Sequence, residues 1–373
     1  MSQPKISVVM AACNVERFLS EAIESILGQT FRDFEFIIVD FGSTDTSRSI
    51  AAEYAARDSR IKLHKIPNCP LPEARNAGSF LAQGQYIAVM DADDISLPER
   101  LKLEVNFMET HPEVGLLGGA VEWVDARGQS LGSHEYPDED PEIRSVLIDR
   151  CPFWHPTVLV RREVFISVGG YRTAFIFAHD YDLELRIAEH FKCANLKQVV
   201  LKYRIHPSQV TFCKQGLQTL CKLAAQASAL SRRENISDPL NGVQQITTAL
   251  LTSLGVSEAA QQNALAADCR NWIRSMSAAR EYPVALQAAI NLLESDRGWV
   301  ESWQIADLYL TVARLHWAQG SLLKSLLAAL QGVLARPAVV GRPLRPLLSW
   351  LRLIRVRSAN IHTSRHSTGL PLK

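Results

Sequence analysis

What the sequence lacks excludes several classes of protein. It has no run of about 18 apolar residues, the length that a helix needs to span a bilayer. A leader peptide is not expected either, because Met1 to Lys5 run directly into a short strand-like segment. The seven cysteines are odd in number and show no CxxC spacing. We therefore expect reduced thiols in a cytoplasmic protein, with neither a disulfide framework nor a zinc site.

Acidic residues are missing from the end of the chain. None follows Asp307, and because the formal net charge is +1, the ten basic residues beyond it leave about −9 on the rest of the chain. Within 343–357, Leu, Ile and Trp alternate with arginines, which predicts peripheral contact with the anionic inner face of the cell membrane. There are two alternatives. The terminus could be solvated, or it could form a packed helix in which the aliphatic parts of the arginine side chains cover apolar surface. The ten are Arg314, Lys324, Arg336, Arg342, Arg345, Arg352, Arg355, Arg357, Arg365 and Lys373.

The first part of the chain has the pattern of an α/β fold. Short apolar runs alternate with helical periods, which predicts a mostly parallel twisted sheet flanked by helices. In such sheets, ligands bind beyond the carboxyl ends of the strands. From about residue 214 only helical periods remain, so we expect an α/β domain over 1–212 and an all-helical region over 213–373. The first four expected strands are 6–12, 34–40, 60–66 and 86–90.

Acidic residues follow two of these strands. Asp40 ends the second, and Asp91-Ala92-Asp93-Asp94 follow the fourth. Three carboxylates so close together repel one another unless a cation lies among them. A hard divalent ion, Mg²⁺ or Mn²⁺, prefers such oxygen ligands. The alternative is a solvated acidic turn before the next helix, which a capping box over 96–99 is expected to open.

Three more polar residues are candidates from their positions alone. Asp180, at the start of an expected helix, could be a general base or a first-turn acid favoured by the helix dipole. Arg75 could clamp a diphosphate or form a salt bridge on the surface of its helix. His206 ends an apolar run and could bind a metal, although a lone histidine is more often structural.

Two other enzyme classes are disfavoured because their glycine-rich loops are missing. A sugar nucleotidyltransferase usually carries such a loop after the first strand, where this chain has Ala11-Ala12-Cys13-Asn14. A nicotinamide dehydrogenase needs GxGxxG in a strand–helix turn, and that pattern is absent.

Motifs over residues 4–212 resemble those of family 2 glycosyltransferases of the GT-A fold, in the same order and spacing. The resemblance implies metal-dependent, inverting transfer of a sugar from a nucleoside-diphosphate donor to a hydroxyl of a glycan or lipid-linked acceptor. It implies a role in glycan, polysaccharide or glycolipid biosynthesis, with no nucleic-acid partner. The QxxRW pattern of processive synthases is absent, which favours transfer of a single sugar. The motifs are 6–10 with Asn14, 22–30, 36–40 with 42–45, 74–78, 91–94, 161–164, 169–171, 180–183 and 203–206.

The resemblance also implies a role for individual residues. Asp180 would be the general base, and Asp91, Asp93 and His206 would hold the metal. The resemblance also implies that Trp154, His155 and His179 border the acceptor side of the site. The residues implied for the nucleotide-sugar pocket are Ala11, Ala12, Cys13, Asp40, Phe41, Arg75, Asp91 and Ala92.

Four positions depart from the family's usual pattern. Ala11 replaces a proline or threonine, Cys13 an aromatic residue and Phe41 an aspartate. The last two positions help relatives to hold a uracil, so UDP is not predicted as the donor nucleotide, and GDP, dTDP or another remains open. His179 replaces a glutamate, which would alter the charge of the pocket near neutral pH. The departures also fit a catalytically degenerate relative that binds a partner through its helical region.

Overall fold

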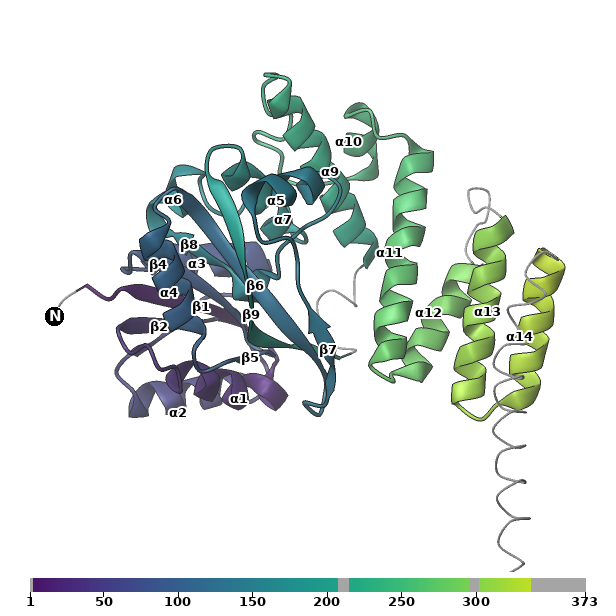
Figure 1. Cartoon of the computed structure of the whole chain (residues 1–373), viewed down its shortest axis with the longest axis horizontal. Helices are drawn as coiled ribbons and strands as arrows, with labels where there is room; N and C mark the ends of the chain where they lie inside the picture. Colours follow the sequence, from purple (N-terminus) through teal and green to yellow (C-terminus); the bar gives the residue numbers. More distant parts are fainter. Residues whose placement is uncertain (1–2, 207–214, 295–301, 337–373) are drawn as a thin grey trace, which may run out of the picture. The chain divides into compact units, whose positions relative to one another are not determined.

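The computed structural model describes residues 3–206, 215–294 and 302–336 (Figure 1). The chain divides into two compact units, one up to Asp268 and one from Cys269 onward. The expected domain boundary at residue 212 and the basic segment 343–357 both lie outside the described residues.

The first unit is built around a nine-stranded sheet. Its strand order is β3-β2-β1-β4-β8-β6-β9-β5, and β7 pairs with β6. The first four strands run parallel, as do β6 and β9, whereas β8, β5 and β7 pair antiparallel. The predicted α/β class with a helical C-terminal region is confirmed, and the later strands make the sheet mixed. The strands are β1 (Ile6–Ala12), β2 (Phe34–Asp40), β3 (Ile61–Lys65), β4 (Tyr86–Asp91), β5 (Ile95–Ser96), β6 (Val114–Asp125), β7 (Ser130–His134), β8 (Leu159–Arg161) and β9 (Lys192–Ile205).

Helices cover both faces of the sheet because alternate strand residues point to opposite sides. On one face Val8 and Met10 pack with α1, α2 and α4. On the other face Val9 and Ile37 pack with α3, α5, α6 and α7. The helices are α1 (Glu16–Leu27), α2 (Ser47–Arg57), α3 (Leu71–Leu81), α4 (Arg100–Thr110), α5 (Asp140–Leu147), α6 (Arg162–Ser167) and α7 (His179–Ala188), with a short 3-10 turn η1 (His155–Thr157).

Parallel pairing brings the ends of three strands to one edge of the sheet. Ala12 pairs with Asp40 of β2, and Ala11 pairs with Asp91 of β4. Helix α3 crosses the sheet so closely that a Cβ on Gly78 would lie 2.7 Å from Val9 Cγ1. This contact needs glycine, and it holds Arg75, one turn earlier on α3, near the same edge.

The predicted capping box over 96–99 is wrong. Ser96 belongs to β5, which pairs antiparallel with Leu201 of β9, and α4 begins only at Arg100. Ser96 is buried, and its Oγ accepts a hydrogen bond from Gln29 Nε2 at 3.1 Å. Tertiary pairing therefore uses a residue that the local pattern assigned to a helix cap.

Only helices follow β9 in the described residues. Helices α9 (Gln215–Arg233) and α10 (Thr248–Ser253) join the core of the first unit, where they pack in the same cluster as α7. Helix α11 (Glu258–Ala278) crosses the division between the units. The second unit contains α12 (Tyr282–Glu294), α13 (Ser302–Ala318) and α14 (Leu322–Ala335). Across the described part of the chain, no helix combines the length and apolar character that crossing a membrane requires.

Candidate active site

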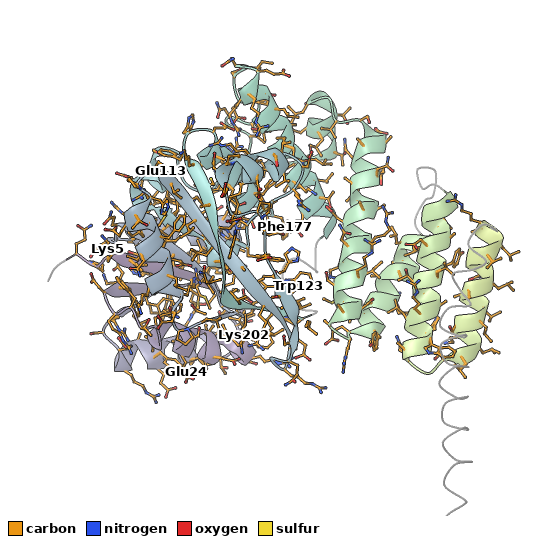
Figure 2. All side chains as sticks on the ribbon, viewed as in Figure 1. Lys5, Glu24, Glu113, Trp123, Phe177 and Lys202 are labelled. Carbon is orange, nitrogen blue, oxygen red and sulfur yellow. The ribbon has the colours of Figure 1, made fainter. Side chains whose placement is uncertain are left out.

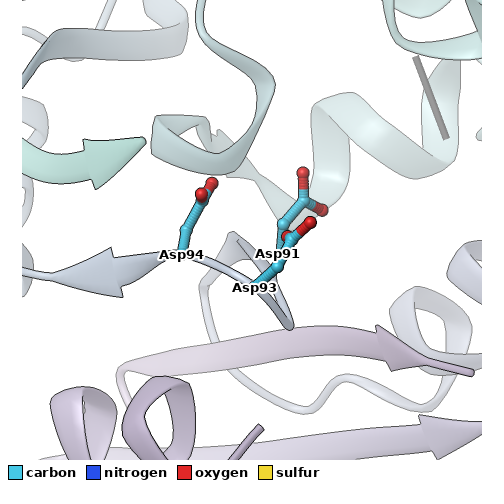
Figure 3. Close-up of side chains that lie close together, drawn as sticks. All are labelled: Asp91, Asp93 and Asp94. Carbon is cyan, nitrogen blue, oxygen red and sulfur yellow. The ribbon is translucent and has the colours of Figure 1, made fainter. Parts of the chain in front are cut away.

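Three carboxylates gather where β4 ends. Asp91 is the last residue of β4, and Asp93 and Asp94 lie in the turn before β5. Their ligand oxygens lie within 4.8 Å of one another, and Figure 3 shows the three side chains pointing to the same side of the loop. Asp94 is 1% exposed, and its Oδ2 has no hydrogen-bond partner within the described residues.

Burial and mutual repulsion raise the pKa values of two carboxylates in this cluster. Burial raises the pKa of Asp94 well above its ordinary value, and the charges of Asp93 and Asp91 raise it further. Burial also raises the pKa of Asp91, and the nearby Arg75 offsets only part of that effect. A divalent cation would favour the charged carboxylates, and oxygen ligands are those that Mg²⁺ and Mn²⁺ prefer. The three side chains therefore fit such an ion.

The end of β9 is anchored on the same loop. Arg204 donates from its backbone N to Asp94 Oδ1 and from Nε to the carbonyl of Asp93, each at 2.8 Å. His206 is the first residue after β9, and its Nε2 lies 3.0 Å from Asp93 Oδ2. Because His206 is buried, this contact brings an imidazole nitrogen to the carboxylate cluster from a distant part of the chain. Of the three residues predicted to hold the metal, Asp91 and Asp93 lie in the carboxylate cluster and His206 contacts Asp93.

Arg75 reaches the cluster from α3. Its Nη2 donates to Asp91 Oδ1 at 2.7 Å, and the side chain is 10% exposed. The alternative of a surface salt bridge within the helix is therefore wrong. Burial lowers the pKa of Arg75, but the combined effects of Asp91, Tyr171 and Asp180 outweigh it, so the pKa is raised. Nη1 is buried without a hydrogen-bond partner in the described residues, so this cation can still receive an anionic ligand.

The residue after Arg75 builds one wall of the site. Asn76 donates from Nδ2 to the carbonyl of Tyr171 at 2.7 Å, and its Oδ1 accepts from Tyr171 N at 2.9 Å. The Tyr171 hydroxyl lies 3.1 Å from His155 Nε2. Gly170 makes this turn possible, because its φ is +68° and a Cβ would lie 2.8 Å from Asn76 Oδ1. The motifs 74–78 and 169–171 therefore contact each other and form this wall together.

Two histidines in this wall are neutral near pH 7. Burial lowers the pKa of His179 to about 4, and the charge of Arg75 lowers it as well. Burial and Arg75 also lower the pKa of His155 well below its ordinary value. Both ring nitrogens of His179 and Nδ1 of His155 are buried with no hydrogen-bond partner in the described residues. A neutral imidazole offers one donor and one acceptor, which suits a hydroxyl group.

Asp180 and Asp182 have different surroundings in the first turn of α7. Asp182 is buried and forms ion pairs with Arg172 and Arg186. Asp180 has no ion pair in the described residues, and its Oδ1 accepts a hydrogen bond from the next backbone N at 2.9 Å. Ala178, before the helix, has φ +52°, a conformation that is uncommon for a residue other than glycine. Asp182 therefore secures the helix, and Asp180 can receive a ligand.

These groups meet in one cavity of about 340 Å³ within the first unit. Asp93 and Asp180 both line it, although they come from parts of the chain that are far apart in sequence. Most of the residues predicted for the site share this cavity. They are Ala11, Cys13, Phe41, Arg75, Asp91, Ala92, Asp93, Trp154, His155, His179 and Asp180.

Three predicted residues do not line the cavity. Ala12 is buried in β1, and His206 reaches the site through the carboxylate cluster. Asp40 accepts hydrogen bonds from Ser43 N at 3.0 Å and from Arg48 Nε. Burial raises the pKa of Asp40, but these bonds outweigh it and the pKa is lowered. In this structure Asp40 closes the turn after β2, and its predicted contact with a nucleoside stays a prediction.

Other residues of the cavity were not found from the sequence. Gln218 comes from α9, and Cys151 and Phe177 come from loops; Phe177 is labelled in Figure 2. The ring of Trp154 lies 5.4 Å from that of Tyr136 and 5.0 Å from that of Tyr203, so one side of the cavity is aromatic. Gln218 lies in a helix without any motif, and nothing in its local sequence indicates the site.

The fold and the cavity define an α/β protein with a carboxylate-rich site at the edge of parallel strands. The glycosyl transferase family 2 model matches residues 7–169. MJ1057 of Methanocaldococcus jannaschii, an uncharacterized glycosyltransferase, is 36% identical over 212 residues, which cover 55% of this chain and 72% of that protein. The O-antigen biosynthesis glycosyltransferase WbnJ of Escherichia coli is 31% identical over 206 residues, covering 54% and 80%. The chain belongs to glycosyl transferase family 2.

Among solved structures, the fold is similar to that of a bacterial protein. S. aureus TarS 1-349 in complex with UDP-GlcNAc has a TM-score of 0.48 and 18% sequence identity, over 87% of this chain and 90% of that chain.

Proposed function

We propose that this enzyme transfers a single sugar from a nucleoside-diphosphate donor to an acceptor hydroxyl, with inversion at the anomeric carbon in a GT-A fold. One observation carries the proposal: Asp93, in the carboxylate cluster, and Asp180 line the same cavity. A donor held at the cluster would present its sugar between the two groups. The α/β region over 1–212 would carry most of this activity, and Gln218 of α9, in the helical region over 213–373, also lines the cavity.

Each residue of the site has a distinct role in the proposed reaction. Asp180 accepts the proton of the attacking hydroxyl, a role for which a carboxylate without an ion pair is suited. Arg75 holds the diphosphate through the N–H groups that Asp91 does not use. His206 orients Asp93 through the contact at 3.0 Å. A Mg²⁺ or Mn²⁺ ion held by Asp91 and Asp93, with His206 beside them, supplies Lewis-acid neutralisation of the departing diphosphate when it is bound.

The base of the donor nucleotide is expected between Cys13 and Phe41. Both residues line the cavity, and Phe41 offers a ring for stacking. No carboxylate at position 41 is present to hydrogen-bond a base edge, so specificity for UDP is not expected. Ala11 and Ala92 line the cavity and are small, which leaves room for the ribose and diphosphate near Asp91.

The acceptor is expected on the side of the cavity formed by Trp154, His155 and His179. Neutral imidazoles beside an aromatic wall suit the hydroxyl groups and apolar faces of a sugar. One relative is named for O-antigen biosynthesis, which supports a glycan or lipid-linked acceptor in polysaccharide biosynthesis. Within the described residues, no disulfide joins Cys13, Cys69, Cys151, Cys193 or Cys221, as expected in a reducing compartment, and we propose a cytoplasmic location.

A donor panel tests this function. The protein is incubated with UDP-, GDP- and dTDP-sugars and Mn²⁺, with and without a chelator, and the release of nucleoside diphosphate is measured. We expect chelator-sensitive release with at least one donor and stabilisation by the matching nucleoside diphosphate in a thermal melt, because ligand binding stabilises the folded state. A catalytically degenerate scaffold would show no turnover with any donor, and that result would exclude the proposal.

A further inference from the structure

The last described helix, α14, presents an aliphatic face to solvent. Its opposite side consists of small residues: Ser325 Oγ donates to the carbonyl of Ala313 at 2.8 Å, and a Cβ on Gly332 would lie 3.2 Å from the carbonyl of Ala306. Because the small residues must face α13 at this distance, the leucines point away from it. The leucine face is Leu322 (55% exposed), Leu323 (75%), Leu326 (55%), Leu327 (58%), Leu330 (56%) and Leu334 (73%).

The leucine face is continuous and not a set of scattered residues. Leu322, Leu326, Leu330 and Leu334 are spaced four apart, so they form one row along α14, and the other two leucines lie beside it. Single apolar residues on a surface need no explanation, but a contiguous apolar patch marks an interaction site.

The charge beside the leucine face has one sign. Lys324 lies within α14 and Arg336 follows it, and the sequence has no acidic residue after Asp307. An apolar helix face accompanied by basic residues is typical of a helix that lies in the interface of an anionic membrane.

We propose that α14 binds a bilayer of anionic lipids, with the leucine face at the boundary between headgroups and acyl chains and the basic residues on the headgroups. A second copy of this chain fits less well, because pairing through this face would bring Lys324 and Arg336 of two copies near one another, and α14 has no acidic residue to offset their charge. The proposal uses no residue of the cavity, so it is independent of the proposed sugar transfer.

Vesicle flotation with the full chain tests this binding. The probes are vesicles of phosphatidylcholine alone and vesicles that also contain phosphatidylglycerol, at low and high salt. One variant combines Leu323→Gln with Leu334→Gln on α14. The matched control combines Leu217→Gln with Leu230→Gln, which are 43% and 49% exposed on α9. We expect salt-sensitive binding to phosphatidylglycerol vesicles that falls by about tenfold or more in the α14 variant and not in the control.

The other outcomes overturn the proposal. If the native chain does not bind phosphatidylglycerol vesicles, or if both variants bind as the native chain does, the leucine face is no membrane site. A dimer that only the α14 variant dissociates, without vesicle binding, assigns the face to a second copy. A lower melting temperature in the α14 variant alone, again without vesicle binding, shows that the chain itself covers the leucines.

Discussion

Replacing Asp180 by asparagine tests the proposed chemical step. Asp180→Asn keeps the size of the side chain and the oxygen that accepts from the next backbone N, but it removes the group that accepts a proton. A positioned general base contributes about 10²–10⁴-fold, so kcat should fall by that factor, which corresponds to about 3–5 kcal/mol in the barrier. Donor binding should change little, because Arg75 and the carboxylate cluster keep their contacts.

Asp182 supplies the matched control on the same helix turn. It is 0% exposed and pairs with Arg172 and with Arg186, whose Nη2 lies 2.9 Å away. Asp182→Asn leaves these guanidinium groups without their buried anion, so we expect a loss of about 3–5 kcal/mol in the free energy of unfolding. The folded fraction should retain its kcat, because Asp182 does not line the cavity.

Two measurements separate these effects. Released nucleoside diphosphate gives kcat, and chemical denaturation gives the free energy of unfolding, for both variants and the native chain. The assignment of the base is refuted if Asp180→Asn turns over at the native rate while it remains folded. It is also refuted if Asp182→Asn, measured on folded protein, loses as much kcat as Asp180→Asn.

Three further predictions concern pH, metal and packing. In the folded state His179 stays neutral down to about pH 4, whereas in the unfolded state it binds a proton below about pH 6.5. The free energy of unfolding should therefore fall by up to about 3 kcal/mol as the pH drops from about 6.5 to about 4, as measured by chemical denaturation. In His179→Gln this part of the pH dependence should disappear, and only the part due to the other titrating groups should remain. Asp93→Asn should abolish the rise in melting temperature caused by Mn²⁺, and an unchanged rise would remove Asp93 from the metal site. Gly78→Ala should cost about 1–3 kcal/mol by overpacking against Val9, whereas Gly216→Ala, with its nearest neighbour 3.6 Å away, should cost nothing measurable.

Local patterns predicted the early strands well. The observed bounds of β1 and β2 are those expected from the runs 6–12 and 34–40. Apolar runs bordered by turn residues specify buried strands within a few residues of chain. The position of Asp91 to Asp94 at the carboxyl end of β4 followed from the same reasoning, because it depends only on where that strand ends.

Local patterns failed where pairing joins distant segments. Ser96 fits a helix cap in its own sequence, yet it pairs with β9, more than a hundred residues away, and accepts a hydrogen bond from Gln29. Gln218 enters the cavity from a helix that carries no motif. Long-range pairing overrides such local preferences, since burial and ladder hydrogen bonds stabilise the whole sheet more than one cap stabilises a helix.

By itself, the sequence determined the α/β class, the strand ends that carry acidic residues and, through family motifs, the residues expected at the site. Only the tertiary structure decided that Asp93 and Asp180 share one cavity, that Asp182 is held by arginines, and that His179 is neutral. It also decided that the leucines of α14 face away from α13. These properties depend on which side chains a group is buried against, and chain segments far apart in sequence supply those neighbours only after folding.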